Sequence, residues 1–362
     1  MASRTPLYER HLATGGRMVD FAGWWMPQQY TSVKEEQEAV RTRAGVFDVS
    51  HMGRFEARGA EVDSFLQRVV TNDVGKLAPN QAQYNLLCLE SGGIIDDLVV
   101  YRGPASWTLV VNASNRGKDL TWLRQQAPDD VAVVDRSDEL GLLALQGPAA
   151  QSLLPAQAVD LAAVPYFGMA QARVAGVDCT ISRTGYTGED GFELFVPAAR
   201  LVEVWDALLA AGAQPCGLAA RDVCRLEAGL RLYGNDMDES VNPYEVGLGW
   251  TVRLKKGDFI GRAALERAKA DGPERLLVGL DCPGRTIPRH GAELKQDGRS
   301  VGHVTSGTYS FWLGKGIGMA MVASDQAEPG RRLEMEGRSG PNTVEIAALP
   351  FYRGSVRQAA RA

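Results

Sequence analysis

The sequence predicts an α+β protein that ends in an all-β domain. Up to about residue 270, helical and strand-like apolar patterns alternate along the chain. Beyond it, short strand-like segments are separated by turn residues. A helix expected over 262–270 ends at Asp271-Gly272-Pro273, which is a strong stop signal. We therefore predict one region at 1–272 and a C-terminal β domain at 273–362.

Helix-capping residues and periodic apolar residues predict the helices and strands of about the first 150 residues. Ser32 and Glu35 form a capping box for a helix over 32–44, and Gly45 follows it as a C-terminal cap. Two strands joined through the double glycine Gly92-Gly93 predict a hairpin. The other expected elements are helices over 60–70 and around 120–123, and strands over 84–89, 98–101, 107–112 and 142–146.

In the middle of the chain, the glycine-rich string GYTGEDG separates two expected strands, 174–183 and 192–196. A helix over 201–211 follows, and then a helix over 220–233 that ends at Gly234. Arg221 and Arg225 are four residues apart on the second helix, so they project from a common side.

The C-terminal domain is expected to contain only strands, over 275–281, 292–296, 301–305, 317–322, 332–335 and 344–348. Its string GRSVG matches the spacing of a serine-hydrolase nucleophile motif, which requires a strand before it and a helix after it. Here Asp297-Gly298 stands between two strand-like segments, so we interpret it as a hairpin turn.

Composition excludes several classes of protein. The net charge of −5 and the pI near 5.6 argue against nucleic-acid binding. No apolar run is long enough to span a membrane, and the N-terminus does not resemble a secretory signal. Five scattered cysteines and four unpaired histidines indicate neither a disulfide framework nor a metal site. We expect a cytoplasmic protein without a metal.

Two adjacent carboxylates, Asp96 and Asp97, interrupt an apolar strand in GGIIDDLVVY. Side chains alternate along a strand, so the two cannot point the same way. One interpretation is a turn at the start of the strand with both acids solvated. The other is a carboxylate directed at a cationic or proton-donating group of a substrate.

Glu193 lies between Phe192 and Leu194 in an alternating strand and therefore faces away from both. It is either a solvent-facing glutamate or a carboxylate that faces a cavity. In the second case it could accept two parallel N–H groups from a guanidine-like ligand edge.

Several longer strings resemble one family, the glycine cleavage T-proteins, or aminomethyltransferases. They occur in the family's order between Thr5 and Arg357. The strings are MVDFAGWWMPQQY, FDVSHMG, GGIIDDLVVY, SRTGYTGEDGFEL, ARDVCRLE, NPYEVGLGW, VTSGTYS and PFYRGSVR.

This resemblance implies a three-domain cloverleaf that binds tetrahydrofolate centrally. Two intertwined α+β subdomains would form 1–272, followed by a jelly-roll or barrel-like domain. The reaction it implies belongs to glycine catabolism and one-carbon metabolism. A lipoylated H-protein carries an S-aminomethyl group, whose methylene passes to tetrahydrofolate to give 5,10-methylenetetrahydrofolate, ammonia and dihydrolipoyl H-protein.

The resemblance also implies roles for individual residues. Asp97 would be the catalytic carboxylate, and Glu193 would bind the 2-amino and N3 positions of the pterin. The remaining residues expected to contact folate are Met52, Tyr84, Asn112, Tyr186, Arg225, Tyr233 and Arg353.

Two alternatives share the scaffold. One is a folate-dependent demethylase, which would use the same pterin contacts. The other is a folate-binding assistant of iron–sulfur maturation, in which a cysteine would stand where this chain has Asp258. One residue departs from the family pattern: Phe311 replaces a proline that usually follows the serine of VTSGTYS.

Overall fold

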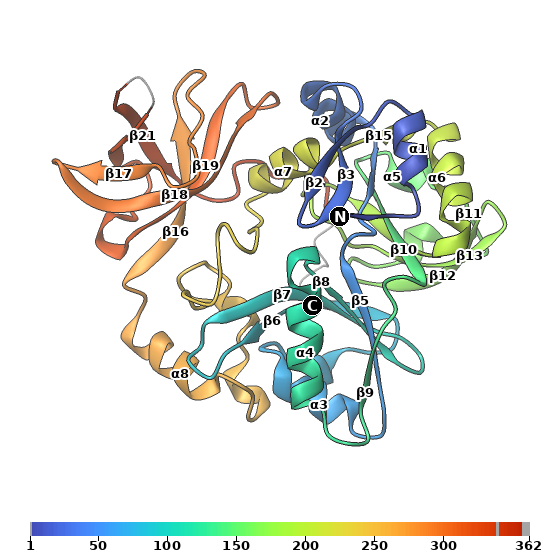
Figure 1. The fold of residues 1–362 in the computed structure, drawn as a ribbon. Coiled ribbons are helices and arrows are strands. Elements are labelled where there is room, and N and C mark those ends of the chain that lie inside the picture. Colours follow the sequence, from blue (N-terminus) through green and yellow to red (C-terminus); the bar gives the residue numbers. More distant parts are fainter. Residues whose placement is uncertain (1, 338–339, 357–362) are drawn as a thin grey trace.

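The computed structural model describes residues 2–337 and 340–356, and its elements form three lobes arranged as a cloverleaf (Figure 1). The first two lobes mix helices and strands, and the third is a barrel. The predicted α+β class, the cloverleaf and the C-terminal all-β domain are confirmed. Among the described helices, none is long and apolar enough to cross a membrane.

The first lobe is built on a seven-stranded sheet and an N-terminal three-stranded sheet. The larger sheet has the order β11 (Ala156–Gln157), β12 (Met169–Val174), β13 (Val177–Ser182), β14 (Gly191–Pro197), β10 (Leu140–Gln146), β4 (Gly45–Asp48), β15 (Gln214–Pro215). The smaller sheet has the order β1 (Ser3–Arg4), β3 (Trp24–Gln29), β2 (Arg17–Phe21).

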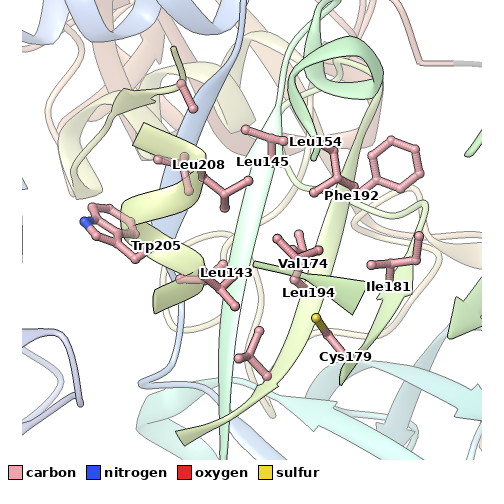
Figure 2. Packing of buried hydrophobic residues seen from close by; sticks show 14 of the residues in the cluster. Leu143, Leu145, Leu154, Val174, Cys179, Ile181, Phe192, Leu194, Trp205 and Leu208 are labelled. Carbon is pink, nitrogen blue, oxygen red and sulfur yellow. The ribbon is translucent and has the colours of Figure 1, made fainter. Parts of the chain in front are cut away.

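Helices cover both faces of the larger sheet. On one face, Trp205 and Leu208 of helix α6 (Leu201–Ala210) pack against Leu143 and Leu145 of β10 (Figure 2). The opposite face is covered by α2 (Val33–Thr42) and α7 (Leu218–Glu227). The first lobe also contains α1 (Tyr8–Ala13) and α5 (Ala150–Leu153).

The second lobe contains a five-stranded sheet with helices on one face. Its strand order is β6 (Gln81–Cys88), β7 (Ile94–Arg102), β8 (Trp107–Val111), β5 (Gly53–Arg58), β9 (Ala132–Asp135). Helices α3 (Val62–Val69) and α4 (Arg116–Gln126) bury their apolar faces against it. Because this lobe is inserted between β4 and β10, the first two lobes are intertwined in sequence.

Strand β7 separates two environments. Leu98 and Val100 pack with the helices of the second lobe. Val99 and Tyr101 belong to a different cluster, which they share with Phe47 and Phe195 of the first lobe. Alternation along the strand therefore directs Asp96 toward the helices and Asp97 toward the first lobe.

The third lobe is a closed barrel that follows α8 (Arg262–Asp271). Its strands, in barrel order, are β16 (Arg275–Cys282), β19 (Lys315–Ala323), β18 (Arg299–Ser310), β17 (Glu293–Gln296), β20 (Arg332–Met335), β21 (Asn342–Ala347). Asp297 and Gly298 have φ of 51° and 75° and turn β17 into β18, so the hairpin interpretation of GRSVG is confirmed.

Helix α7 is shorter than predicted, because it ends at Glu227 and not at Tyr233. Gly229 has φ +68°, its N–H donates to the Leu226 carbonyl, and the next N–H, of Leu230, donates to Arg225. This is a Schellman cap, which ends the helix at the first glycine that can adopt the left-handed conformation. The periodic apolar residues beyond it do not lie on the helix.

Other predicted boundaries also move. The strand expected over 98–101 begins at Ile94, which places both aspartates inside it. The segment predicted as one strand over 174–183 turns at Ala175-Gly176, with φ of 52° and 75°, so that β13 begins at Val177. Gly45 begins β4 and is not a helix cap. The helix expected near 120–123 extends over all of α4.

Candidate active site

Asp97 lies on the face of β7 that is turned toward the first lobe, and its carboxylate accepts two side-chain hydrogen bonds. The Tyr84 hydroxyl of β6 donates to Oδ2 over 2.9 Å. The Asn112 amide, at the end of β8, donates to Oδ1 over 2.8 Å. Three adjacent strands thus bring Tyr84, Asp97 and Asn112 together.

Asp96 is fully buried on the opposite side of the strand, so the interpretation with both acids solvated is wrong. Its Oδ1 accepts the same Asn112 amide group over 2.8 Å and the Asn115 amide over 2.7 Å. The Asn112 backbone N–H donates to its Oδ2 over 3.1 Å. Asn112 therefore connects the two aspartates. Within residues 2–337 and 340–356, no cluster of acidic, histidine or cysteine side chains could hold a metal ion.

The environment of Asp97 disfavours its anion. Burial and the nearby Asp96 charge raise the pKa of Asp97 to about 7, although the hydrogen bonds from Tyr84 and Asn112 oppose the shift. Burial also raises the pKa of Tyr84. Asp97 can therefore exchange a proton near neutral pH, which suits a group that both stabilises positive charge and transfers a proton.

Glu193 of β14 is only 8% exposed, so the interpretation as a solvent-facing glutamate is wrong. Its Oε2 accepts the Thr184 hydroxyl over 2.5 Å and the Tyr101 hydroxyl over 3.1 Å. Tyr101 comes from β7, so Glu193 is oriented by both lobes. Oε1 receives no hydrogen bond from the part of the chain that the structure describes.

Arg221 of α7 has an incompletely paired guanidinium. Its Nη1 is buried and has no hydrogen-bond partner among the described residues. The guanidinium carbon lies 4.7 Å from the centre of the Tyr186 ring, and the hydroxyl of Tyr186 donates to the Arg231 carbonyl. Burial lowers the pKa of Arg221, while the charge of Glu193 opposes that shift. A buried donor without a partner fits a ligand that offers an acceptor oxygen.

Arg225, one turn further along α7, is fully engaged within the protein. It donates to Asp222 over 2.8 Å, to Asp236 over 2.6 Å and to the Ser306 hydroxyl of the barrel over 2.9 Å. These contacts connect the helix to the third lobe. The structure gives Arg225 a clear scaffolding role, whereas the donor left available is on Arg221.

Met52 and Tyr233, which the resemblance assigned to folate contacts, lie in different surroundings. Met52 is half-buried and packs in the cluster between the first two lobes, next to the buried His51. The Tyr233 hydroxyl donates to the Ile94 carbonyl over 3.1 Å and accepts from Lys118 over 3.0 Å. Tyr233 is thereby fixed against the strand that carries Asp97.

The C-terminal string PFYRGSVR contacts two of the other strings. The Ser355 N–H and hydroxyl donate to Glu189 over 2.8 and 2.6 Å, and the Tyr352 N–H donates to the Glu227 carbonyl over 2.9 Å. Arg353 is exposed, and Arg357 lies outside the described residues. Phe311, where the resemblance leads us to expect a proline, donates its backbone N–H to the Gln37 side chain over 3.2 Å. A proline has no N–H and could not form this bond.

Sequence reasoning did not assign Arg221, Asp119 or Trp250 to the site. Asp119 lies on α4 four residues before Leu123, and both are buried, so helical periodicity is the signal that could have found it. Trp250 is 55% exposed and stacks on Tyr84, with 5.9 Å between ring centres. No local signal distinguishes Arg221 from Arg225, because both lie on the same side of one helix.

Comparisons with known families agree with this geometry. Residues 7–256 match the GCVT N-terminal domain, and residues 275–353 match the glycine cleavage T-protein C-terminal barrel domain. An aminomethyltransferase of Geobacillus kaustophilus is 49% identical over 98% of this chain and 99% of its own length. One of Bacillus subtilis is 44% identical over 98% of this chain and its full length.

A solved structure shows the same architecture. The crystal structure of the glycine cleavage system aminomethyltransferase T from Bartonella henselae superimposes with a TM-score of 0.93. It is 32% identical to this chain, and the match covers 99% of this chain and 100% of the other. With two family models that together span most of its length, the chain belongs to the glycine cleavage T-protein, or aminomethyltransferase, family.

Proposed function

We propose that this protein is the tetrahydrofolate-dependent aminomethyltransferase of a glycine cleavage system. Its donor would be the S-aminomethyl-dihydrolipoyl group of a lipoylated H-protein. The products would be 5,10-methylenetetrahydrofolate, ammonia and dihydrolipoyl H-protein. The observation that carries the proposal is the environment of Asp97, a carboxyl with a pKa of about 7 that Tyr84 and Asn112 hold in one orientation.

The unpaired groups of the site fit a folate. The pterin edge is a cyclic guanidine with adjacent N–H donors, and Glu193 has an oxygen available to accept them. Arg221 offers the complementary donor beside Tyr186. We place Met52, Tyr84, Asn112, Tyr186 and Tyr233 around the rest of the ligand. Arg353 would contact its exposed end, and Arg225 would support the site by holding α7 against the barrel.

In this mechanism the protein supplies positioning and one proton-transfer group. Glu193 and Arg221 fix the orientation of the acceptor, which converts an encounter of two molecules into a reaction within one complex. The Asp97 carboxylate stabilises the positive charge that develops on the substrate nitrogen. It then accepts the proton that this nitrogen loses, while Tyr84 and Asn112 keep the receiving oxygens in place.

The test supplies aminomethyl-loaded H-protein and tetrahydrofolate and follows methylenetetrahydrofolate and ammonia together. We expect both products from the native chain. Asp97→Asn should reduce turnover at least about 100-fold, as removal of a general acid–base group does, while folate still binds. Folate binding without either product would contradict the aminomethyl donor and favour a demethylase or a folate-binding protein. Unchanged turnover in the variant would contradict the role of Asp97.

A further inference from the structure

Lys118 of α4 lies beside the ring of Tyr233, at the point where β7 begins. Its ammonium donates three hydrogen bonds, to the Ile95 carbonyl over 2.7 Å, the Tyr233 hydroxyl over 3.0 Å and Glu239 over 3.3 Å. An ammonium has three N–H groups, so each of them has an acceptor. Lys118 therefore connects the second lobe to the segment 233–241, which follows α7.

These contacts determine the direction of the Tyr233 hydroxyl. A lysine ammonium can only donate, so the phenolic oxygen accepts from Lys118. The same hydroxyl lies 3.1 Å from the Ile94 carbonyl, which can only accept. The single hydroxyl hydrogen of Tyr233 is therefore directed at Ile94. Tyr233 can present its aromatic ring to a bound molecule, but no O–H donor.

The backbone also holds the segment 233–241 against β7. The Ile94 N–H donates to the Val241 carbonyl over 3.1 Å. Gly93 approaches the segment so closely that a Cβ there would lie 2.0 Å from the Glu239 carbonyl oxygen. These main-chain contacts place the segment, but they do not fix the hydroxyl end of the Tyr233 ring. That end is fixed by its two hydrogen bonds.

We propose that Lys118 is a positioning residue, which holds the Tyr233 ring in the orientation that receives an aromatic part of the folate. The inference rests on the proposed function, in which Tyr233 borders the ligand. A ring that is fixed before binding loses less conformational entropy when the ligand binds, so the hydrogen bond from Lys118 should raise the affinity. Nζ of Lys118 also lies 4.6 Å from the centre of the Tyr233 ring, within the range of a cation–π contact.

The first test needs no ligand. In the free protein, nitrogen–proton correlation spectra of the lysine side chains should contain an ammonium signal that exchanges slowly with solvent and that is lost in Lys118→Met. Tyr233→Phe keeps the ring but removes one of the three acceptors of this ammonium, so it should shift the signal. Absence of the signal, or a signal that Tyr233→Phe leaves unchanged, would overturn the proposal.

The second test is a double-mutant cycle on the dissociation constant of tetrahydrofolate. We expect Lys118→Met and Tyr233→Phe each to raise that constant about 3- to 10-fold, the equivalent of ordering one more side chain on binding. Both variants remove the same interaction, so Lys118→Met should have almost no further effect in the Tyr233→Phe background. Lys269→Met is the matched control: Lys269 is an exposed lysine of α8, and its replacement should leave the constant unchanged.

The outcomes separate the possible failures. If Lys118 acts only on the fold, through Ile95 and Glu239, its replacement weakens binding equally in both backgrounds, and that result refutes the proposal. If tetrahydrofolate binds as expected but no methylene transfer occurs, the proposed function fails while the role of Lys118 stands. Should Lys118→Met not fold, Lys118→Arg takes its place in the cycle, because a planar guanidinium does not reproduce three N–H groups on one nitrogen.

Discussion

Replacing Asp97 with asparagine should stabilise the protein at neutral pH while it reduces turnover at least about 100-fold. A carboxyl with an ordinary pKa of 3.8 titrates at about 7 in this position, because burial and Asp96 disfavour its anion. Between these pH values the folded state retains a proton that the unfolded state has released. The free energy of unfolding therefore falls as pH rises toward 7. Asparagine does not titrate, so the free energy of unfolding of the variant does not fall in this way.

The structure limits the size of the gain. A shift from 3.8 to about 7 corresponds to about 4 kcal/mol, at about 1.4 kcal/mol per pH unit. The new amide oxygen can still accept the Asn112 N–H, but the Tyr84 hydroxyl must reverse its hydrogen bond to accept from the new amide. We therefore expect the free energy of unfolding of Asp97→Asn to exceed that of the native protein by about 1–3 kcal/mol above pH 7. This difference should fall to near zero at about pH 4.

Urea denaturation of both proteins at several pH values between about 4 and 8 measures this difference. Asp325→Asn serves as the matched control, because Asp325 is exposed and lies in a short 3-10 helix after β19. Its unfolding free energy should follow that of the native chain. If Asp97→Asn is no more stable than the native protein at about pH 8, the account of the Asp97 environment is refuted.

Three further predictions concern other parts of the molecule. Asp48→Asn should show the opposite pH dependence: the His11, Ser50 and Thr5 hydrogen bonds lower the pKa of this buried carboxyl to about 2. The free energy of unfolding of this variant should be about 2 kcal/mol below that of the native protein at pH 7. The difference should shrink as pH falls from about 4 to 2, as measured by urea denaturation. Gly229→Ala should cost about 1–2 kcal/mol in thermal unfolding, because φ is +68° and the new Cβ would lie 3.3 Å from Leu349. Trp250→Ala should change stability by less than about 1 kcal/mol yet lower kcat/KM several-fold, since the exposed indole supports the Tyr84 ring; an unchanged kcat/KM would contradict that role.

The sequence alone was sufficient for the parts of the fold that depend on neighbouring residues. The Ser32 hydroxyl accepts the Glu35 N–H over 3.2 Å at the predicted start of α2. The Gly92-Gly93 hairpin joins β6 and β7 as expected. Alternation along β7 correctly required Asp96 and Asp97 to face opposite sides. These features follow from backbone geometry over a few residues, which local sequence specifies.

Helix and strand ends were less predictable, because tertiary contacts select among possible stop positions. Both Gly229 and Gly234 could end the helix that carries Arg221 and Arg225, and both have positive φ. The helix ends at the first, where the C-terminal segment packs against it: a side chain at Gly229 would meet Leu349 and Pro350. That segment is more than a hundred residues away in sequence, so no local pattern contains the information.

In the candidate site, too, the sequence specifies some features and tertiary contacts decide others. Residue types and motifs predicted roles for Asp97 and Glu193, but only the tertiary structure showed that Tyr101 of another lobe orients Glu193. Arg221 and Arg225 are equivalent by helical spacing. The barrel and Asp236 satisfy the donors of Arg225, while Nη1 of Arg221 remains without a partner among the described residues. Sequence determines which groups a helix presents, whereas burial and distant partners decide which of those groups remain available to a ligand.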